Sequence, residues 1–222
     1  MRDEFSNPYF ISAPDGWCSA DNRVMIVGKE GAGWGAGKNI LDPIHDRDKI
    51  REYTRIYPMV QEGVLAPDVY DGHEYMPNGS KFWQWFRKIY NEIKTPVIWN
   101  NFDKIHRMND NASYCKLNKK ERELLHRTSI KVLSEEIKIL QPTHVIFFGY
   151  YKNFLSYELP EIAEKLSIED YKGMVIFNNT KYIFANHPNW SRFHRGYEDG
   201  IIKFIKDELN ESNGLLSPEI IS

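Results

Sequence analysis

Short apolar runs alternate with longer amphipathic stretches along most of the chain. Four of these runs have the length and composition of buried strands and end in glycine or asparagine: residues 23–28, 96–100, 144–149 and 182–186. A fifth run, residues 174–177, is followed by Asn178-Asn179-Thr180. An asparagine-rich turn of this kind favours a hairpin into the last of the four strands.

The amphipathic stretches predict helices at residues 80–92, 119–140 and 197–209. In the longest of them, apolar residues recur at three- and four-residue spacing, which is the period of one helix face. Strands that alternate with helices are typical of a sheet covered on both faces. The pattern therefore predicts an α/β protein, a three-layer αβα sandwich around a central, mainly parallel four-stranded sheet.

Length and composition favour one domain. A chain of 222 residues, 41% of them hydrophobic, can bury one sizeable core. We expect a single domain over residues 1–222, with its core at about residues 20–210 and a loosely held tail at 211–222. Residues 63–79, which are rich in proline and glycine, predict a long functional loop.

Charge and cysteine content exclude several classes of protein. The 29 basic and 31 acidic residues give a net charge of -2, so any contact with DNA would use a local basic patch. Cys18 and Cys115 lie too far apart in the chain for a disulfide framework, a zinc site or a four-cysteine cluster. No run reaches signal-peptide character or the roughly 20 apolar residues of a membrane span. We expect a cytoplasmic protein without membrane contact.

A loop with five glycines at residues 28–37 follows the first predicted strand. Glycine lets a ligand approach the backbone, and open α/β sheets bind ligands at the carboxyl ends of their strands. The loop is not a phosphate-binding P-loop, because Ala32 and Asn39 occupy its required glycine and hydroxyl positions. It fits a dinucleotide fingerprint only loosely, since Asp42-Pro43 interrupts the helix that such a motif opens.

Polar residues stand at three predicted strand ends. Glu30 follows the first strand, Asn100 and Asn101 the second, and His187 the last. These groups converge at one edge if the sheet is parallel. A carboxylate can orient water or stabilise a cation, a carboxamide can read a hydrogen-bonding edge, and an imidazole can stabilise a developing anion. The set suits hydrolysis of an N-glycosidic bond.

Four segments, in their order along the chain, resemble the uracil-DNA glycosylase superfamily. Gly28-Lys29-Glu30-Gly31-Ala32 is similar to the family's Gly-x-Asp-Pro-Tyr-like loop after the first strand, and His187-Pro188-Asn189 to its His-Pro-Ser-like loop after the last. Residues 99–104 resemble the strand end that carries the family's base-reading asparagine, and residues 141–149 resemble its third strand. The resemblance covers about residues 20–195 and rests on the order and spacing of these motifs.

The resemblance implies a monofunctional DNA glycosylase of base-excision repair. In that family the target nucleotide swings out of the DNA stack into a pocket, and its glycosidic bond is cleaved through an oxocarbenium-like cation. Glu30 would orient water or balance the cation, and His187 would hydrogen-bond the departing base as it becomes anionic. Asn101, or Asn100 in its place, would read the edge of the base, which is uracil or another damaged base.

The remaining roles also follow from the resemblance. Gly28 and Lys29 would contribute to the base pocket, and one of three aromatic residues would stack on the base: Tyr75, Phe82 or Trp34. A loop after the last strand would meet single- or double-stranded DNA, with Trp190 as a wedge and the other contacts made by Asn189, Ser191, Arg192, His194 and Arg195. Neither a metal nor a cofactor is expected, and a monomer is favoured.

The chain departs from the family pattern at three positions. Gly31 and Ala32 replace the proline and the residue after it, and Asn189 replaces a serine. Because Ala32 cannot shield the pocket against a thymine methyl group as a tyrosine would, selectivity for uracil is not implied. Two alternatives stay open: a hydrolase of free nucleosides or nucleotides, and a catalytically silent module of the same fold that binds nucleic acid, a nucleotide or a protein partner.

Each candidate also has a purely structural interpretation. Glu30 can accept backbone N–H bonds at the turn, His187 can bond a backbone carbonyl, and the asparagine pair can form a turn. The aromatic residues at 82–86 fit the buried face of one helix, so core packing is the expected role of that cluster.

Overall fold

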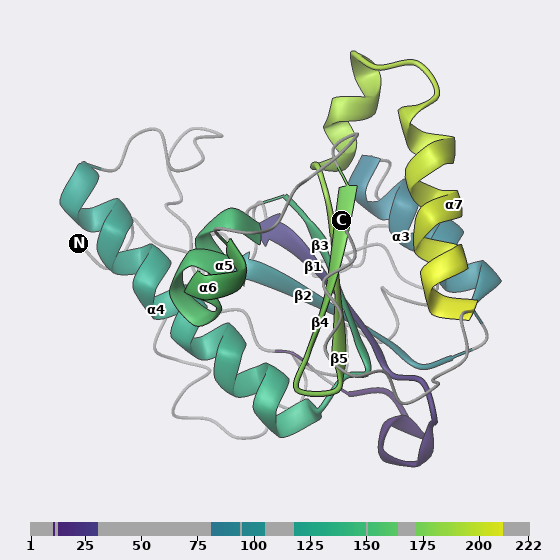
Figure 1. Ribbon diagram of the computed structural model, residues 1–222, viewed down its shortest axis with the longest axis horizontal. Coiled ribbons are helices and arrows are strands. Elements are labelled where there is room, and N and C mark those ends of the chain that lie inside the picture. Colours follow the sequence, from purple (N-terminus) through teal and green to yellow (C-terminus); the bar gives the residue numbers. More distant parts are fainter. Residues whose placement is uncertain are drawn as a thin grey trace, which may run out of the picture.

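The computed structural model describes residues 11, 13–30, 81–93, 95–104, 118–149, 151–163 and 172–210, and only the backbone at 30, 151, 161 and 162 (Figure 1). Several predicted features lie outside the described residues. They are most of the glycine-rich loop, the long loop at 63–79, the tail at 211–222, Trp34 and Tyr75.

Within the described residues, five strands form one sheet in the order β2-β1-β3-β5-β4. The strands are β1 (Val24–Glu30), β2 (Val97–Asp103), β3 (His144–Phe148), β4 (Lys172–Phe177) and β5 (Thr180–Ala185). All neighbouring pairs are parallel except β4 and β5, which are antiparallel. The mainly parallel sheet is confirmed, whereas the count of four strands was wrong because β4 adds a fifth.

The β4–β5 hairpin forms because of the two asparagines at its turn. Asn178 and Asn179 have φ angles of 49° and 61°. Two successive residues with positive φ give the tight turn whose twist matches that of antiparallel strands, and asparagine tolerates this conformation better than most residues. The predicted hairpin is thereby confirmed.

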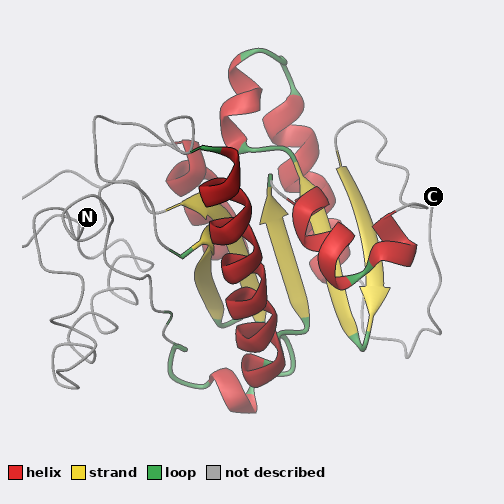
Figure 2. Cartoon of the chain, turned by 90° about the vertical axis from the view of Figure 1, so that its left-hand side faces the viewer, coloured by secondary structure: helices red, strands yellow, loops and turns green. Residues whose placement is uncertain are grey.

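Helices cover both faces of the sheet (Figures 1 and 2). One face carries α3 (Lys81–Glu92) and α7 (Tyr197–Asn210), and the other carries α4 (Lys119–Leu140), α5 (Tyr151–Glu158) and α6 (Pro160–Ala163). Two short 3-10 helices complete the described elements: η2 (Trp17–Ser19) and η4 (Pro188–Arg192). No helix in the described part of the chain is long and apolar enough to cross a membrane.

The helix that was predicted most clearly has a strong start signal. The Asn118 side chain accepts a hydrogen bond from the Glu121 backbone N–H, and the Glu121 carboxylate accepts one from the Asn118 N–H, both at 3.0 Å. This capping box satisfies two backbone donors at the start of α4. The helix ends at Gln141, whose φ of 47° is incompatible with a further helical turn.

The aromatic residues of α3 are mainly core residues, as predicted. Trp83, Trp85 and Phe86 are buried against the sheet, together with Ile89. Phe82, at the first turn of the helix, packs against the same cluster but stays partly exposed. One aromatic ring of the cluster therefore remains accessible next to the sheet edge.

The two faces of the sheet bury separate apolar clusters. Val24 and Ile26 of β1 pack on the α3 side, whereas Met25 and Val27 pack on the α4 side. This is the period of two that strand geometry imposes on side chains. The same alternation places any two consecutive residues of β2 on opposite faces.

The carboxyl ends of β1, β2, β3 and β5 gather at one edge of the sheet, which we call the carboxyl edge. Here β1 and β2 run two and three residues further than predicted, because Gly28 and Glu30 still pair with Asn101 and Asp103. The polar residues that were expected to follow these strands therefore belong to them: Glu30 is the last residue of β1, and Asn100 and Asn101 lie inside β2. Backbone pairing holds them in a defined register instead of in loops.

Candidate functional site

Asn101 is the central residue of the carboxyl edge. It is 1% exposed, and its Oδ1 accepts a hydrogen bond from Trp99 Nε1 at 3.2 Å. Because an indole only donates, this contact sets which end of the amide faces Trp99. The buried Nδ2 has no hydrogen-bond partner among the described residues. A buried amide donor left without an acceptor costs about 1–3 kcal/mol of stability. A ligand that supplies an acceptor here would remove that cost on binding.

Gly28 and Phe82 lie directly beside this amide. A Cβ atom on Gly28 would come within 2.8 Å of Phe82 Cε2 and 3.2 Å of Asn101 Oδ1. Only glycine allows the ring and the amide to approach the backbone of β1 this closely. The structure thus brings together three of the predicted base-pocket residues, one from each of β1, β2 and α3.

His187 stands just after β5, at the same edge. Its Nδ1 accepts a hydrogen bond from the Asn189 backbone N–H at 3.2 Å, so the neutral ring carries its proton on Nε2. Burial, and then the positive charge of Lys29, lower the pKa of His187 below its ordinary 6.5. Near pH 7 the ring is therefore a neutral hydrogen-bond donor through Nε2.

Gly149 brings the end of β3 against this histidine. Its φ is 83°, and a Cβ atom there would lie 3.5 Å from His187 Cβ. The Gly149 N–H also donates to the Ala185 carbonyl at 2.8 Å, which ties the end of β3 to the end of β5. The position of His187 is therefore set by backbone contacts with its neighbouring strand.

Two charged groups border the site. Lys29 follows Gly28 on β1 and lowers the pKa of both His187 and His126 of α4, so its charge acts on both rings. Glu30 is the last residue of β1, in register with Asp103, and its side chain lies outside the described part of the structure. Asp103 is 2% exposed, and strand alternation places it on the same face of β2 as Asn101.

Sequence reasoning missed Asp103 as a candidate. The only signal available was its position two residues after Asn101, which becomes informative once β2 is known to extend to residue 103. A buried carboxylate at this edge is a second candidate, beside Glu30, for orienting water or balancing a cation.

Asn100 does not join this site. Its Nδ2 donates to Glu136 of α4 at 2.9 Å, and its Oδ1 accepts from Lys104 Nζ at 2.5 Å and from the Asn101 backbone N–H at 2.8 Å. Lys104 and Glu136 also form an ion pair at 2.5 Å. Burial lowers the pKa of Lys104, and the nearby Glu136 opposes that effect. The side chain of Asn100 is thus engaged in a polar network on the α4 side.

The loop predicted to meet DNA begins with η4. Asn189 and Arg192 are exposed, as is Arg195 just beyond it. The Ser191 hydroxyl donates to the Pro188 carbonyl at 2.8 Å and so stabilises the loop itself. Two basic side chains of this loop are accordingly open to solvent close to His187 in the chain.

The aromatic residues of this loop differ in their exposure. Trp190, the predicted wedge, stacks on His194 with ring centroids 4.8 Å apart and is 37% exposed. Phe193 is 81% exposed, the largest value among the large hydrophobic residues that the structure describes. Sequence reasoning missed Phe193, although its place between Arg192 and Arg195 was a usable signal.

Comparison of the chain with models of protein families and with curated proteins found no match. Function is therefore inferred from the chemistry of the carboxyl edge. Within the described residues, no group of three or more histidine, cysteine, aspartate or glutamate side chains could hold a metal ion. What the edge offers is a buried amide donor beside an aromatic ring, and a neutral imidazole donor.

Proposed function

We propose that this chain hydrolyses N-glycosidic bonds as a DNA glycosylase of base-excision repair, with a fold similar to that of the uracil-DNA glycosylase superfamily. One observation carries the proposal. The amide of Asn101, whose buried Nδ2 has no acceptor among the described residues, lies beside Gly28 and Phe82, at the same sheet edge as the neutral donor of His187. A nucleobase has a flat face and a hydrogen-bonding edge, and these groups complement both.

Asn101 gives the site a preference among bases. Its Oδ1 already accepts from Trp99, so the group that it offers a ligand is the Nδ2 donor. The keto oxygen at C4 of uracil or C6 of hypoxanthine accepts this hydrogen bond, whereas the amino group that cytosine or adenine carries at the same position does not. The partly exposed ring of Phe82 would stack on the base. The arrangement favours uracil or hypoxanthine over cytosine or adenine.

His187 and a carboxylate would share the chemical step. As the bond from C1′ to the base nitrogen breaks, negative charge moves onto the base, and His187 Nε2–H stabilises it by donating to a base carbonyl oxygen. Water attacks C1′ and loses a proton to the carboxylate. The resemblance assigns the carboxylate to Glu30, and the burial of Asp103 at the same edge makes it the alternative.

The loop after His187 would hold the DNA. Arg192 and Arg195 are exposed and can contact phosphates. The exposure of Phe193 favours it over Trp190 as the wedge that fills the space left by the flipped base. The phosphate contacts would then come from the loop after β5, and the base pocket from β1, β2 and α3 at the same edge of the sheet.

Base release tests the proposal. Oligonucleotides with uracil, hypoxanthine, xanthine or an oxidised pyrimidine, single- and double-stranded, would be incubated with the wild-type protein and with His187→Ala, Glu30→Ala and Asp103→Asn. Glu135→Ala, on the exposed face of α4, is the matched control. We expect His187→Ala and one carboxylate variant to lower turnover at least about 100-fold. Free nucleosides and nucleotides would be assayed in parallel. Base release from these alone would support the nucleotide hydrolase, and release from neither kind of substrate would support the silent binding module.

A further inference from the structure

A cavity of about 530 Å³ lies at the amino edge of the sheet, the end opposite to the carboxyl edge. Arg23, Thr143 and Thr180 line it, and they stand at or directly before the starts of the parallel strands β1, β3 and β5. Most of its other walls come from α4, α5 and the β4–β5 hairpin. No predicted site residue lines this cavity, so an inference about it does not depend on the proposed function.

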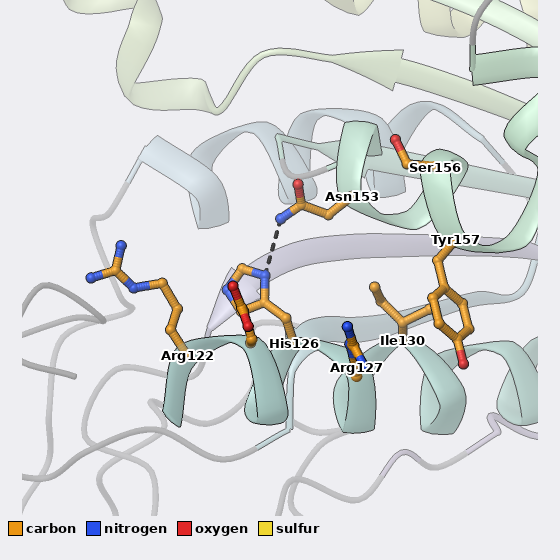
Figure 3. A pocket seen from close by; sticks show the side chains of 8 residues that line it. Arg122, His126, Arg127, Ile130, Asn153, Ser156 and Tyr157 are labelled. Atoms are coloured by element: carbon orange, nitrogen blue, oxygen red, sulfur yellow. Dashed lines mark hydrogen bonds between the residues drawn. The ribbon is translucent and has the colours of Figure 1, made fainter. Parts of the chain in front are cut away.

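A second cavity, of about 350 Å³, lies between the first half of α4 and α5. Figure 3 shows that its two arginines, Arg122 and Arg127, lie on opposite sides of His126. They therefore do not present one common binding point to a ligand. At the amino edge, by contrast, a carboxylate and a hydroxyl line the same cavity, and the charge of the first acts on the second.

The carboxylate belongs to Glu158, the one acidic residue among the described residues that line the amino-edge cavity. It forms no ion pair and no hydrogen bond with another described residue. The two basic side chains of the lining do have partners. Lys138 pairs with Glu135 at 2.7 Å, and Arg23 donates to two backbone carbonyls at 2.9 Å. Within the described residues, the cavity therefore holds a half-buried negative charge that lacks a close cation.

Tyr182 supplies the hydroxyl. Its side chain is 6% exposed and packs on Phe154, with 6.1 Å between the ring centroids. The hydroxyl forms no hydrogen bond with another described residue, and its oxygen is not one of the described polar atoms that are enclosed without a partner, so it is open to the cavity. Burial, and then the charge of Glu158, raise the pKa of Tyr182 to about 12. The hydroxyl is therefore neutral at pH 7, and its oxygen can accept a hydrogen bond.

The helix ends around the cavity also favour positive charge. The last turn of α4 contributes Ile137 and Lys138 to the lining, and α5 ends at Glu158. The carbonyl groups at the carboxyl end of a helix carry partial negative charge, so cations are stabilised there and carboxylates are not. A bound cation would offset the charge of Glu158 and of both helix ends.

We propose that the amino-edge cavity binds an organic ammonium ion with an apolar body, through Glu158 and Tyr182. The ammonium group would donate to the carboxylate and to the hydroxyl oxygen, and hydrogen bonds from a charged donor are stronger than those between neutral groups. The apolar body would pack on Ile137, Phe154 and Leu159, which are buried residues of the lining. A volume of about 530 Å³ suits a small molecule of this kind.

Three probes of similar size test the role of charge: benzylammonium, benzyl alcohol and benzoate. Amide NMR shifts of the whole chain would report where each probe binds and how tightly. Glu158→Gln removes the charge, and Tyr182→Phe removes the hydroxyl but keeps the ring. Asp207→Asn is the matched control, because Asp207 is exposed on α7, which covers the other face of the sheet.

We expect benzylammonium to bind at millimolar concentrations and to shift the amide resonances of the cavity lining. Benzyl alcohol and benzoate should bind at least about 10-fold more weakly, because neither brings a positive charge. Glu158→Gln should weaken benzylammonium binding about 10-fold or more, and Tyr182→Phe about 5-fold, since each loses one acceptor of the ammonium group. Asp207→Asn should bind all three probes like the wild type.

The proposal is overturned if no probe shifts the resonances of the cavity lining, or if the three probes bind the wild type equally. It is also overturned if Glu158→Gln binds benzylammonium as tightly as Asp207→Asn does. Preferential binding of benzoate would reject it as well, and would assign the cavity to an anion beside Arg23. The three probes on the wild type decide the question even if Tyr182→Phe does not fold.

Discussion

Asn100 and Asn101 are neighbours in sequence, but their side chains lie on opposite faces of β2. The amide of Asn100 faces α4 and is engaged by Glu136 and Lys104. The side chain of Asn101 lies on the α3 face of β2, and its Nδ2 has no acceptor among the described residues. Both side chains are buried. Within the described residues, the two differ in whether the protein completes their hydrogen bonds, and that difference distinguishes a structural residue from a candidate binding residue.

The physical reason is the cost of an incomplete polar group. A buried network in which every polar group has a hydrogen-bond partner holds the sheet and its helix in one arrangement. It leaves no donor or acceptor for a ligand. A buried donor without an acceptor lowers the stability of the fold. A ligand that supplies the acceptor removes this cost, so its binding is favoured. The comparison therefore predicts opposite responses to mutation on the two faces of β2.

The largest effect is expected on the Asn100 side. Glu136→Leu removes the ion-pair partner of the buried Lys104 ammonium, which should lower the free energy of unfolding by about 3–5 kcal/mol in urea titrations at pH 7. The double variant Lys104→Met/Glu136→Leu removes both charges and should recover most of that loss. If the single variant is as stable as the wild type, this network is not part of the scaffold.

His144 tests whether a buried nitrogen without a hydrogen-bond partner is enough to indicate a binding site. It is 1% exposed at the start of β3, its Nε2 lacks a partner in the described part of the chain, and burial followed by the charge of Lys181 lowers its pKa to about 4. The unfolded chain takes up a proton near pH 6.5 and the folded one does not. Stability should therefore fall by up to roughly 3 kcal/mol between pH 6.5 and 4.

His144→Asn should flatten this dependence in urea titrations at pH 7 and pH 5, while base release at pH 7 stays at the wild-type level. Such a result would place His144 in the scaffold, far from the carboxyl edge. Lower base release in a variant that is folded normally would instead assign it to the site.

On the other face of β2, Asn101→Ala should separate activity from stability. The variant loses one hydrogen bond from Trp99 but also removes the incomplete donor, so its stability should change by no more than about 1 kcal/mol. Base release should fall about 100-fold in kcat/KM, because the reading of the base edge is lost. A stability loss as large as that of Glu136→Leu would make Asn101 a scaffold residue like its neighbour.

The smallest effect is expected from Lys29→Gln. Activity requires neutral His187 and is lost as pH falls through its pKa, which the charge of Lys29 helps to keep low. Without that charge the pKa rises, so the acidic limb of the pH–rate profile should move to higher pH. Lys29→Arg retains the charge and should leave the limb in place. An unchanged limb in both variants would show that Lys29 does not act on the reacting histidine.

Local signals in the sequence were sufficient for most of the fold. The helix at 119–140 was predicted from its apolar period with the bounds that the structure has, and the structure adds the capping box at Asn118. The strands were placed to within three residues at either end, with the largest error, three residues, where polar residues end β2. Those polar residues resemble a turn in sequence, and only pairing with β1 keeps them in the sheet.

The amino-acid sequence by itself determined the alternation of strands and helices and the hairpin at Asn178-Asn179. It also placed Glu30, the asparagine pair and His187 on or directly after three of the parallel strands. These features depend on period, turn chemistry and capping, which act over a few residues. Only the tertiary structure decided which asparagine lies at the candidate site. That choice depends on contacts with Glu136, Lys104 and Trp99, and on the register between β1 and β2. Burial by other elements, together with these partners, determines how much free energy it costs to bury each polar group.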